Sequence, residues 1–338
     1  MPVSIIVGAQ YGSEGKGKVA FAWARNTGAR VAVRVGGPNS GHTVVQGGVP
    51  TVLRQLPTPS LLEGRLSILT PGSYINVDVL LNEIGLVGAN PSNLVIDPRA
   101  VIVTQDHIAT ERSQHLGERI GSTCSGVGAA VAERVRRQGK TLRARDTPAL
   151  QPFLGDTLPL LRGLANRERV VVEGTQGFGL SLLHGLEGDY ATSRDTTAAG
   201  FLSEVGLSPL DVDEVVLVAR AFPIRVAGNS GTLSHEIDWS DVGARAGREV
   251  TAERTTVTNR VRRVGEFDSS LVKRAIDANR PSHIVLNHLD YVADMQSVDG
   301  IAAARAFLSN AEREIGQTID YVGIDRESLE TRSSILSR

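Results

Sequence analysis

Short runs of aliphatic and β-branched residues recur along the chain, and several lead directly into glycine-rich turns. Nearly continuous apolar runs of this length are typical of strands in a sheet that is covered on both faces. The pattern therefore predicts strands at residues 3–7, 31–35, 66–69, 101–103, 170–172, 215–218 and 284–286.

Segments between these runs have the periodicity of helices. Strands that alternate with helices indicate an α/β fold, here a mostly parallel central sheet flanked by helices. The polar stretch 226–266 is the least regular part of the chain and is expected to form loops. No internal repeat or low-complexity linker divides the sequence, so we predict a single domain over 1–338 with loop insertions. The predicted helices cover residues 16–26, 76–86, 105–117, 127–138, 267–279 and 301–315.

Composition narrows the class of protein. A content of 41% hydrophobic but only 4% aromatic residues in a chain of 338 predicts a large, mainly aliphatic core. The 36 basic and 37 acidic residues nearly cancel, which argues against a nucleic-acid partner, since that would require a broad basic surface. The one cysteine, Cys124, excludes an internal disulfide and suits a reducing compartment. We see no signal peptide and no membrane-length apolar run, so we expect a cytoplasmic protein without membrane contact.

The stretch GAQYGSEGKGK at 8–18 follows the first predicted strand and holds four glycines and two lysines. Its second half matches the phosphate-binding pattern G-x-x-x-x-G-K, but Val19 stands where a Walker loop has the Ser or Thr that holds magnesium. Glycines let backbone N–H groups approach phosphate oxygens, and the start of a helix favours anions. We predict a P-loop-like phosphate site; the alternative is a plain turn with two solvated lysines.

A second glycine-rich loop, GGPNSGHT at 36–43, also follows a predicted strand. It places Asn39 and His42 where α/β proteins gather their ligand sites. A hydrogen bond donated by His42 would stabilise charge that develops on a phosphate bridge oxygen. The second loop strengthens the phosphate hypothesis that the first loop raises.

Together the two loops resemble those of the adenylosuccinate synthetases, which join aspartate to a purine nucleotide with a nucleoside triphosphate and Mg²⁺. The resemblance spans nearly the whole chain. The length of the chain is similar to that of the compact archaeal and phage members of the family. Further matching motifs follow in order: GSTCSGVG (121–128), AERVRR (132–137), VEGTQG (172–177), YATSRDTTAAG (190–200), TVTNRVRRVGEFD (256–268), NHLD (287–290) and GIDR (323–326).

The resemblance implies a site for the donor triphosphate. Backbone groups of 15–18 would cradle its phosphates, His42 would stabilise charge at the β–γ bridge, and Mg²⁺ would be bound by Ser13 and the carbonyl of Gly41. The catalytic residues would be Ser13, Lys16, His42 and Gln176. The full donor set is Gly12, Ser13, Glu14, Gly15, Lys16, Gly17, Lys18, Gly41, His42, Thr43, Asn287, His288, Asp290 and Gly323.

The resemblance also implies sites for the other two substrates. Thr258 and Arg262 would bind the carboxylates of L-aspartate, which suits the pairing of arginine with carboxylates. Arg137 resembles an arginine that reaches the monophosphate from a neighbouring subunit, which implies a homodimer. The purine-monophosphate set is Asn39, Ser122, Thr123, Arg137, Gln176, Thr192, Arg225, Gly228 and Arg260.

Two parts of the sequence depart from the family pattern. The segment 287–290 reads Asn-His-Leu-Asp where the family usually has Thr-Lys-Leu-Asp, so ATP or dATP becomes a credible donor in place of GTP. Ser13 stands where the family has the aspartate that accepts the N1 proton of hypoxanthine. A carboxylate with an ordinary pKa near 4 is a far better base than a serine hydroxyl, whereas serine is smaller and both donates and accepts hydrogen bonds.

Phage enzymes that act on dGMP resemble this family but lack that aspartate, and a short side chain leaves room for the 2-amino group of guanine. The resemblance therefore implies a ligase that joins L-aspartate to C6 of dGMP with ATP or dATP through a 6-phosphoryl intermediate. The product would be N6-succino-2-amino-2′-deoxyadenylate, made in the host cytoplasm if the protein is phage-encoded. Glu14, a water or Ser13 would assist the N1 proton.

Three alternatives stand beside this hypothesis. The first is a compact adenylosuccinate synthetase that uses IMP and GTP, against which Ser13 and His288 count. The second is an inactive nucleotide-binding protein, which the retained Lys16 and His42 argue against. The third is a P-loop kinase, which Val19 disfavours.

Overall fold

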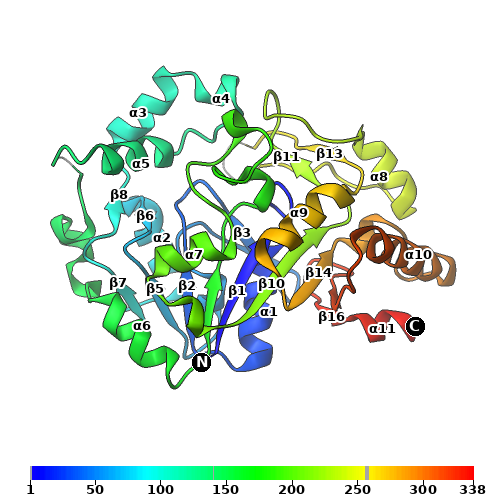
Figure 1. The fold of residues 1–338 in the computed structure, drawn as a ribbon, viewed down its shortest axis with the longest axis horizontal. Helices are drawn as coiled ribbons and strands as arrows, with labels where there is room; N and C mark the ends of the chain where they lie inside the picture. The colour runs from blue at the N-terminus through cyan, green and yellow to red at the C-terminus, as the bar shows by residue number, and fades with distance from the viewer. Residues whose placement is uncertain (1, 140, 256–258) are drawn as a thin grey trace.

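A nine-stranded sheet runs through the computed structural model, which describes residues 2–139, 141–255 and 259–338 (Figure 1). Its order is β16-β15-β14-β10-β1-β9-β2-β5-β7, and every neighbouring pair is parallel except β15 and β16. The predicted α/β fold with a mostly parallel sheet is confirmed. The strands are β1 Val3–Gly8, β2 Val31–Arg34, β5 Leu66–Leu69, β7 Leu94–Ile96, β9 Val170–Glu173, β10 Val212–Arg220, β14 His283–Asn287, β15 Tyr321–Val322 and β16 Glu330–Thr331.

The central strands are apolar throughout because both faces of the sheet are buried. Successive side chains of β1 point to opposite faces, so Ile5 packs in one core cluster and Ile6 in another. Helix α1 covers the face of Ile6, while α6, α7, α9 and α10 cover the face of Ile5. Figure 1 shows α7 and α9 crossing in front of the sheet.

The described residues form helices of very different length. In chain order they are α1 Lys16–Thr27, α2 Val77–Val87, α3 Gln105–Ser113, α4 Leu116–Arg119, α5 Val127–Arg136, α6 Thr157–Ala165, α7 Ala198–Val205, α8 Trp239–Ala246, α9 Ser269–Asn279, α10 Val298–Ile315 and α11 Arg332–Leu336. In this part of the chain no helix has both the length and the apolar character needed to cross a bilayer.

Three small sheets accompany the large one. They pair β3 with β4, β6 with β8, and β13 with both β11 and β12. Their strands are β3 His42–Gln46, β4 Val49–Leu53, β6 Tyr74–Ile75, β8 Val101–Ile102, β11 Ile224–Arg225, β12 Glu236–Ile237 and β13 Arg263–Gly265.

Three sequence predictions of elements need correction. The strand predicted at 101–103 is β8, which pairs with β6 outside the central sheet. The helix predicted at 105–117 breaks into α3 and α4, because His115 adopts a left-handed conformation with φ 53°. The stretch 226–266 is not only loop: it contains β12, β13 and α8, whose first turn is closed by a capping box of Asp238 and Asp241.

The connections position the site. Because β1, β2, β9, β10 and β14 are parallel, the loops that follow them emerge at one edge of the sheet. From β1 the chain builds the sheet towards β7 on one side, and β10, β14 and β15 extend it on the other. Such a change of direction opens a crevice at the carboxyl ends of the strands, where ligands bind in open α/β sheets.

The core makes a stability prediction at Phe201 in α7. This side chain is fully buried, and a Cβ on Gly174 would lie only 2.2 Å from its ring. We expect Phe201→Ala to lower the free energy of unfolding in urea by about 3–5 kcal/mol, because it leaves a cavity. Leu210→Ala is the matched control, since Leu210 is 90% exposed. Equal effects of the two substitutions would contradict the assigned packing.

Candidate active site

A cavity of about 600 Å³ opens at the carboxyl edge of the sheet. Its wall brings together most of the residues that the sequence singled out, although they come from segments far apart in the chain. Those that line it are Gly12, Ser13, Gly15, Lys16, Gly17, Lys18, Asn39, Gly41, His42, Thr43, Ser122, Thr123, Gln176, Thr192, Arg225, Arg262 and His288.

The other predicted site residues lie elsewhere. Arg260 lines a second cavity of about 230 Å³ that shares Ser122 and Thr123 with the first. Arg137 is exposed at the C-terminal end of α5. Thr258 lies outside the described residues. Beside the main cavity but not in its wall are Glu14, Gly228, Asn287, Asp290 and Gly323.

Helix α1 begins at the first glycine-rich loop and offers its N-terminus to the cavity. Its N-cap is Gly15, which has no side chain to bond the first N–H groups, and its first turn carries no acidic residue. Gly15 has φ 91°, and a Cβ there would lie 2.6 Å from Nδ2 of Asn287. A Cβ on Gly17 would lie 2.6 Å from Cβ of His42. The glycines therefore let the two loops meet, and the open helix end suits an anion.

Glu14 holds the first loop in shape from within. Its carboxylate is buried and accepts hydrogen bonds from the backbone N–H groups of Gln10 and Gly12, at 3.0 and 2.8 Å. Its other oxygen accepts from Nζ of Lys16 at 2.6 Å. Since both oxygens are taken, Glu14 is a structural carboxylate in this loop and not a free base.

Lys18 links α1 to the turn of Asp325 in the cavity wall. Its Nζ donates to the carbonyl of Asp325 at 2.9 Å. Burial lowers the pKa of Lys18 to about 8, against the opposing charges of Asp325 and Asp290. At neutral pH its ammonium therefore remains largely charged inside the cavity wall.

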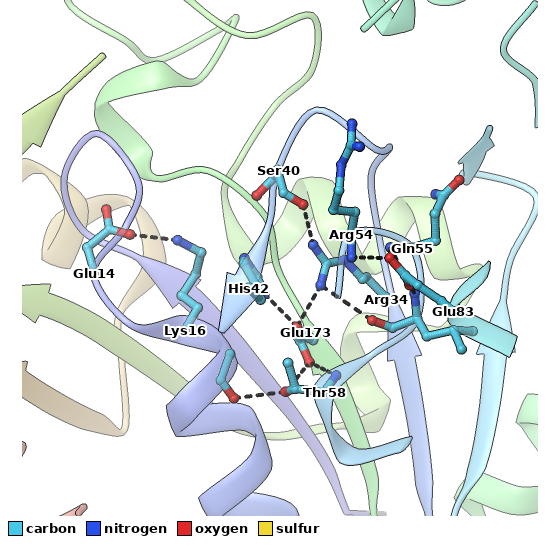
Figure 2. A network of polar contacts seen from close by, with 12 residues as sticks. Glu14, Lys16, Arg34, Ser40, His42, Arg54, Gln55, Thr58, Glu83 and Glu173 are labelled. Atoms are coloured by element: carbon cyan, nitrogen blue, oxygen red, sulfur yellow. Dashed lines mark hydrogen bonds and ion pairs between the residues drawn. The ribbon is translucent and has the colours of Figure 1, made fainter. Parts of the chain in front are cut away.

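His42 is held by a buried carboxylate (Figure 2). Its Nδ1 lies 2.5 Å from Oε1 of Glu173, the last residue of β9. The other oxygen of Glu173 accepts from both the N–H and the hydroxyl of Thr58, each at 2.7 Å. Arg34 of β2 donates to Oε1 at 3.1 Å and to the carbonyl of Ser40 at 2.7 Å. The imidazole is thus fixed on one side with its Nε2 free of these bonds.

The charges of this network follow from its burial. Burial would raise the pKa of Glu173, but the hydrogen bond from His42 and the charge of Arg34 outweigh it and lower the pKa below its ordinary value. Burial lowers the pKa of His42 to about 4, Arg34 adds to this, and Glu173 opposes it. At neutral pH the network is therefore an ionised Glu173 beside a neutral His42.

Ser13 faces the arginine-rich segment. It adopts φ 58°, and its hydroxyl accepts a hydrogen bond from Nη1 of Arg262 at 2.6 Å. The carbonyl of Ser13 accepts from Nη1 of Arg220 at 3.0 Å, and Nη2 of Arg220 donates to Glu253 at 2.6 Å. The charge of Arg220 outweighs the effect of burial and lowers the pKa of Glu253 to about 2. These contacts tie the segment of Glu253 and Arg262 to the phosphate loop.

Acidic groups in the described cavity wall are already engaged. Glu111 accepts from the backbone N–H groups of Gly126 and Gly128 at 2.8 and 2.7 Å. Glu253 is paired with Arg220, and Asp325 accepts from two backbone N–H groups of its own turn. Gln176, by contrast, has a buried Oε1 without a hydrogen-bond partner among the described residues. The carboxylates of the described wall thus serve the fold, and the Gln176 side chain contributes an amide beside them.

Several functional groups escaped the sequence prediction. Glu253 lies in the cavity wall, and the others are buried residues that do not line it: Arg34, Thr58, Glu173 and Arg220. Glu173 lies within the motif VEGTQG. A charged residue directly after an apolar strand is the sequence signal that points to a functional role for it. The others depend on contacts that only the folded chain reveals.

The open helix end, the two lysines and the arginine cluster define a nucleotide-binding α/β enzyme site. A family model described as adenylosuccinate synthetase matches residues 5–148 and 144–331. The adenylosuccinate synthetase of Methanococcus aeolicus is 35% identical to this chain, covering 98% of it and 99% of the relative. That of Thermococcus onnurineus is 36% identical, covering 95% of each. The chain belongs to the adenylosuccinate synthetase family and is a C–N ligase that joins aspartate to a purine nucleotide.

Two solved structures are similar over nearly the whole chain. One is the cyanophage S-2L succinoaminodeoxyadenylate synthetase (PurZ), bound to dGMP and to dATP as an energy donor. It has a TM-score of 0.85 and 29% identity, covering 99% of this chain and 97% of its own. The other is the fully ligated adenylosuccinate synthetase from Plasmodium falciparum, with a TM-score of 0.85, 20% identity and coverage of 98% and 100%. At 20% identity, the similarity to the Plasmodium falciparum structure supports the fold alone.

The neutral His42 predicts a pH dependence of stability. Its pKa is about 4 in the folded state, below its ordinary value of 6.5, so the unfolded chain binds more protons between these values. The stability from a neutral His42 is present above pH 6.5 and falls as the pH drops towards 4. We expect His42→Gln to flatten this decline by up to about 1.4 kcal/mol per pH unit in urea unfolding without ligands. The exposed His184→Gln is the control, and equal slopes for the two variants would contradict the prediction.

Proposed function

We propose that this ligase joins L-aspartate to C6 of dGMP, with ATP or dATP as the phosphate donor. The product is N6-succino-2-amino-2′-deoxyadenylate. The observation that carries the proposal is Ser13, whose small neutral hydroxyl lies at the junction of the phosphate loop and Arg262. The structure of the cyanophage relative, with dGMP and dATP bound, supports the same pair of nucleotides.

The width of the purine edge favours a short side chain at this position. Hypoxanthine presents one N1–H beside C2–H, and a carboxylate opposite it can take that proton. Guanine carries an amino group on C2, so the same edge is wider and has more donors. A serine hydroxyl is short, and it accepts a hydrogen bond without demanding a proton. Ser13 leaves room for this wider edge, and Gln176 lines the same cavity.

The reaction follows two displacements. O6 of the purine attacks the γ-phosphorus and releases the nucleoside diphosphate, and the amine of aspartate then displaces the phosphate from C6. We assign the phosphates of the donor to the N-terminus of α1 with Lys16 and Lys18. With Glu173 accepting from Nδ1, a neutral His42 has no proton on Nε2, so His42 donates from Nε2 towards the β–γ bridge only as the imidazolium, a form that the negative charge of the bound phosphates would favour. Because Glu14 is engaged within its loop, proton removal from N1 falls to Ser13 or a water.

Mg²⁺ is the cofactor of the family, and the donor chemistry of the cavity fits it. The described residues contain no group of three or more His, Cys, Asp or Glu side chains able to hold a metal. The wall does offer the Ser13 hydroxyl and the Gly41 carbonyl, and Mg²⁺ in nucleotide enzymes takes its other ligands from phosphates and water. We therefore assign Ser13 and Gly41 to Mg²⁺, which when bound would neutralise charge on the donor's phosphates.

Three further assignments complete the proposal. Arg262, with Thr258, binds the carboxylates of aspartate. The monophosphate lies between Asn39, Thr123 and Thr192, whose segments meet in the cavity. Arg137 lies outside the cavity and is exposed, which suits an arginine that completes the monophosphate site of a second subunit in a homodimer. Residues 1–338 act as one catalytic unit, which the family match to both halves of the chain supports.

A substrate panel tests the proposal directly. Purified protein with Mg²⁺ and L-aspartate should release phosphate with dGMP and ATP or dATP, and the release should depend on both dGMP and aspartate. The second candidate function, IMP with GTP, is favoured by the names of the archaeal relatives. Phosphate release with IMP but not with dGMP would refute the proposal in favour of that candidate.

The Ser13–Arg262 contact makes a second prediction. In Ser13→Asp the new carboxylate would pair with Arg262, which we assign to aspartate, and would crowd the 2-amino group. We expect kcat/KM for dGMP to fall at least about tenfold, and the KM for L-aspartate to rise by a similar factor. Ser13→Ala is the matched control for the KM of L-aspartate, because it adds no carboxylate and keeps Arg262 free. Unchanged dGMP turnover in Ser13→Asp would remove the steric argument.

A further inference from the structure

Arg248 forms an ion pair with Asp290 beside the active-site cavity. Its Nη2 donates to Oδ2 of Asp290 at 2.9 Å and to the Asp290 carbonyl at 3.3 Å. The guanidinium also lies 5.9 Å from the ring centre of Tyr291. Arg248 follows Gly247, the left-handed cap that ends α8, and its own N–H donates to the Gly243 carbonyl at 3.2 Å. The C-terminal end of α8 therefore fixes the backbone position of Arg248.

Neither carboxylate oxygen of Asp290 is both exposed and unpaired. Oδ2 is held by Arg248, while Oδ1 is buried and has no hydrogen-bond partner among the described residues. Burial raises the pKa of Asp290, against the opposing charges of Arg248 and Lys18. A buried oxygen without a partner is costly, so a purely structural ion pair would be expected to satisfy both oxygens.

Asp290 lies beside the cavity wall, near enough to Lys18 of α1 for its charge to raise the pKa of that ammonium. It lies in η7 (Leu289–Tyr291), which follows β14. His288 and Tyr291, on either side of it in the chain, line the cavity, and so do Asp325 and Arg326. Lys18 runs from the phosphate loop to this part of the cavity wall and bonds the Asp325 carbonyl. A donor whose phosphates lie on α1 would bring its base here.

The two purine bases make opposite demands on a carboxylate. Guanine presents N1–H and an N2 amino group side by side, and a free carboxylate accepts from both. Adenine presents an N1 lone pair, which a carboxylate oxygen repels, beside a single N6 amino group. An exposed, unpaired carboxylate beside this part of the cavity therefore favours guanine, and one that is held away favours adenine.

We propose that Arg248 sets the donor preference for adenine over guanine nucleotides by holding Asp290 away from the base. The inference rests on the proposed function only in taking this part of the cavity as the donor's base site. It adds a specificity-determining residue that touches no reacting atom. Arg248 acts through Asp290, and removing it would free Oδ2 and allow both oxygens to turn towards a guanine edge.

Binding of nonhydrolysable donors tests the inference. The full chain with Mg²⁺ should bind AMPPNP more tightly than GMPPNP in isothermal titration calorimetry, without dGMP or aspartate. In Arg248→Ala we expect the affinity for GMPPNP to rise about tenfold, because one bidentate pair with a base is worth this factor or more. The affinity for AMPPNP should not rise, so the ratio of the two dissociation constants should shift towards GMPPNP.

Two further variants keep the inference falsifiable. Arg245→Ala removes another arginine of α8, which pairs with Glu266, and should leave both affinities unchanged. The double variant Arg248→Ala with Asp290→Asn should lose the gain for GMPPNP, because an amide cannot accept from both guanine groups. An unchanged GMPPNP affinity in Arg248→Ala, or a gain that survives Asp290→Asn, would overturn the inference.

The two proposals fail separately. If the wild-type enzyme used IMP in place of dGMP, the proposed acceptor would be wrong while the donor titrations remained decisive. If Asp290→Asn alone weakened AMPPNP binding tenfold, Asp290 would contact the adenine directly, and the role given to Arg248 would be wrong.

Discussion

The carboxylate of Glu173 is the interaction on which the active site depends. It ends a central strand and bonds three segments at once: His42 in the second loop, Arg34 in β2 and Thr58 in η1 (Thr58–Leu61). A buried charge is stable only when it is paired and bonded, and Glu173 meets both conditions. Removing Arg34 would leave the charge of Glu173 uncompensated in the core. Removing His42 or Thr58 would take away hydrogen bonds of the buried carboxylate, so the positions of these segments are fixed together.

The same use of acids recurs around the cavity. Glu14 closes the phosphate loop, Glu83 accepts backbone N–H groups of 54–56, and Glu111 binds the start of α5. These carboxylates organise backbone that has no regular ladder to join. The described wall therefore presents mainly cations, neutral imidazole, hydroxyls and amides to a ligand. Such a surface suits substrates that bring their own negative charge.

The sequence predicted the parts of this protein whose signals are local. Long apolar runs identified the central strands, and glycine loops after them identified the ligand edge, because both patterns depend on neighbouring residues. It missed α6, α7 and α8, which are short and take their stability from packing. It also missed three residues whose carboxylate partners are distant in the chain. Arg34 and Thr58 lie 139 and 115 residues from Glu173, and Arg220 lies 33 residues from Glu253. Pairings over such distances leave no periodic trace in the chain.

The bridge from Arg220 and Arg262 to Ser13 has a thermodynamic consequence. These contacts join the phosphate loop to the segment of Arg262, and the two would hold different substrates. A ligand that moves one of them must therefore also break or strain its hydrogen bonds to the other. The binding free energies at the two places are then not independent. By linkage, whatever one occupant adds to the affinity of the second, the second adds to the first. Under the substrate assignments proposed above, this hydroxyl–guanidinium contact would couple the binding of the two substrates on either side of it.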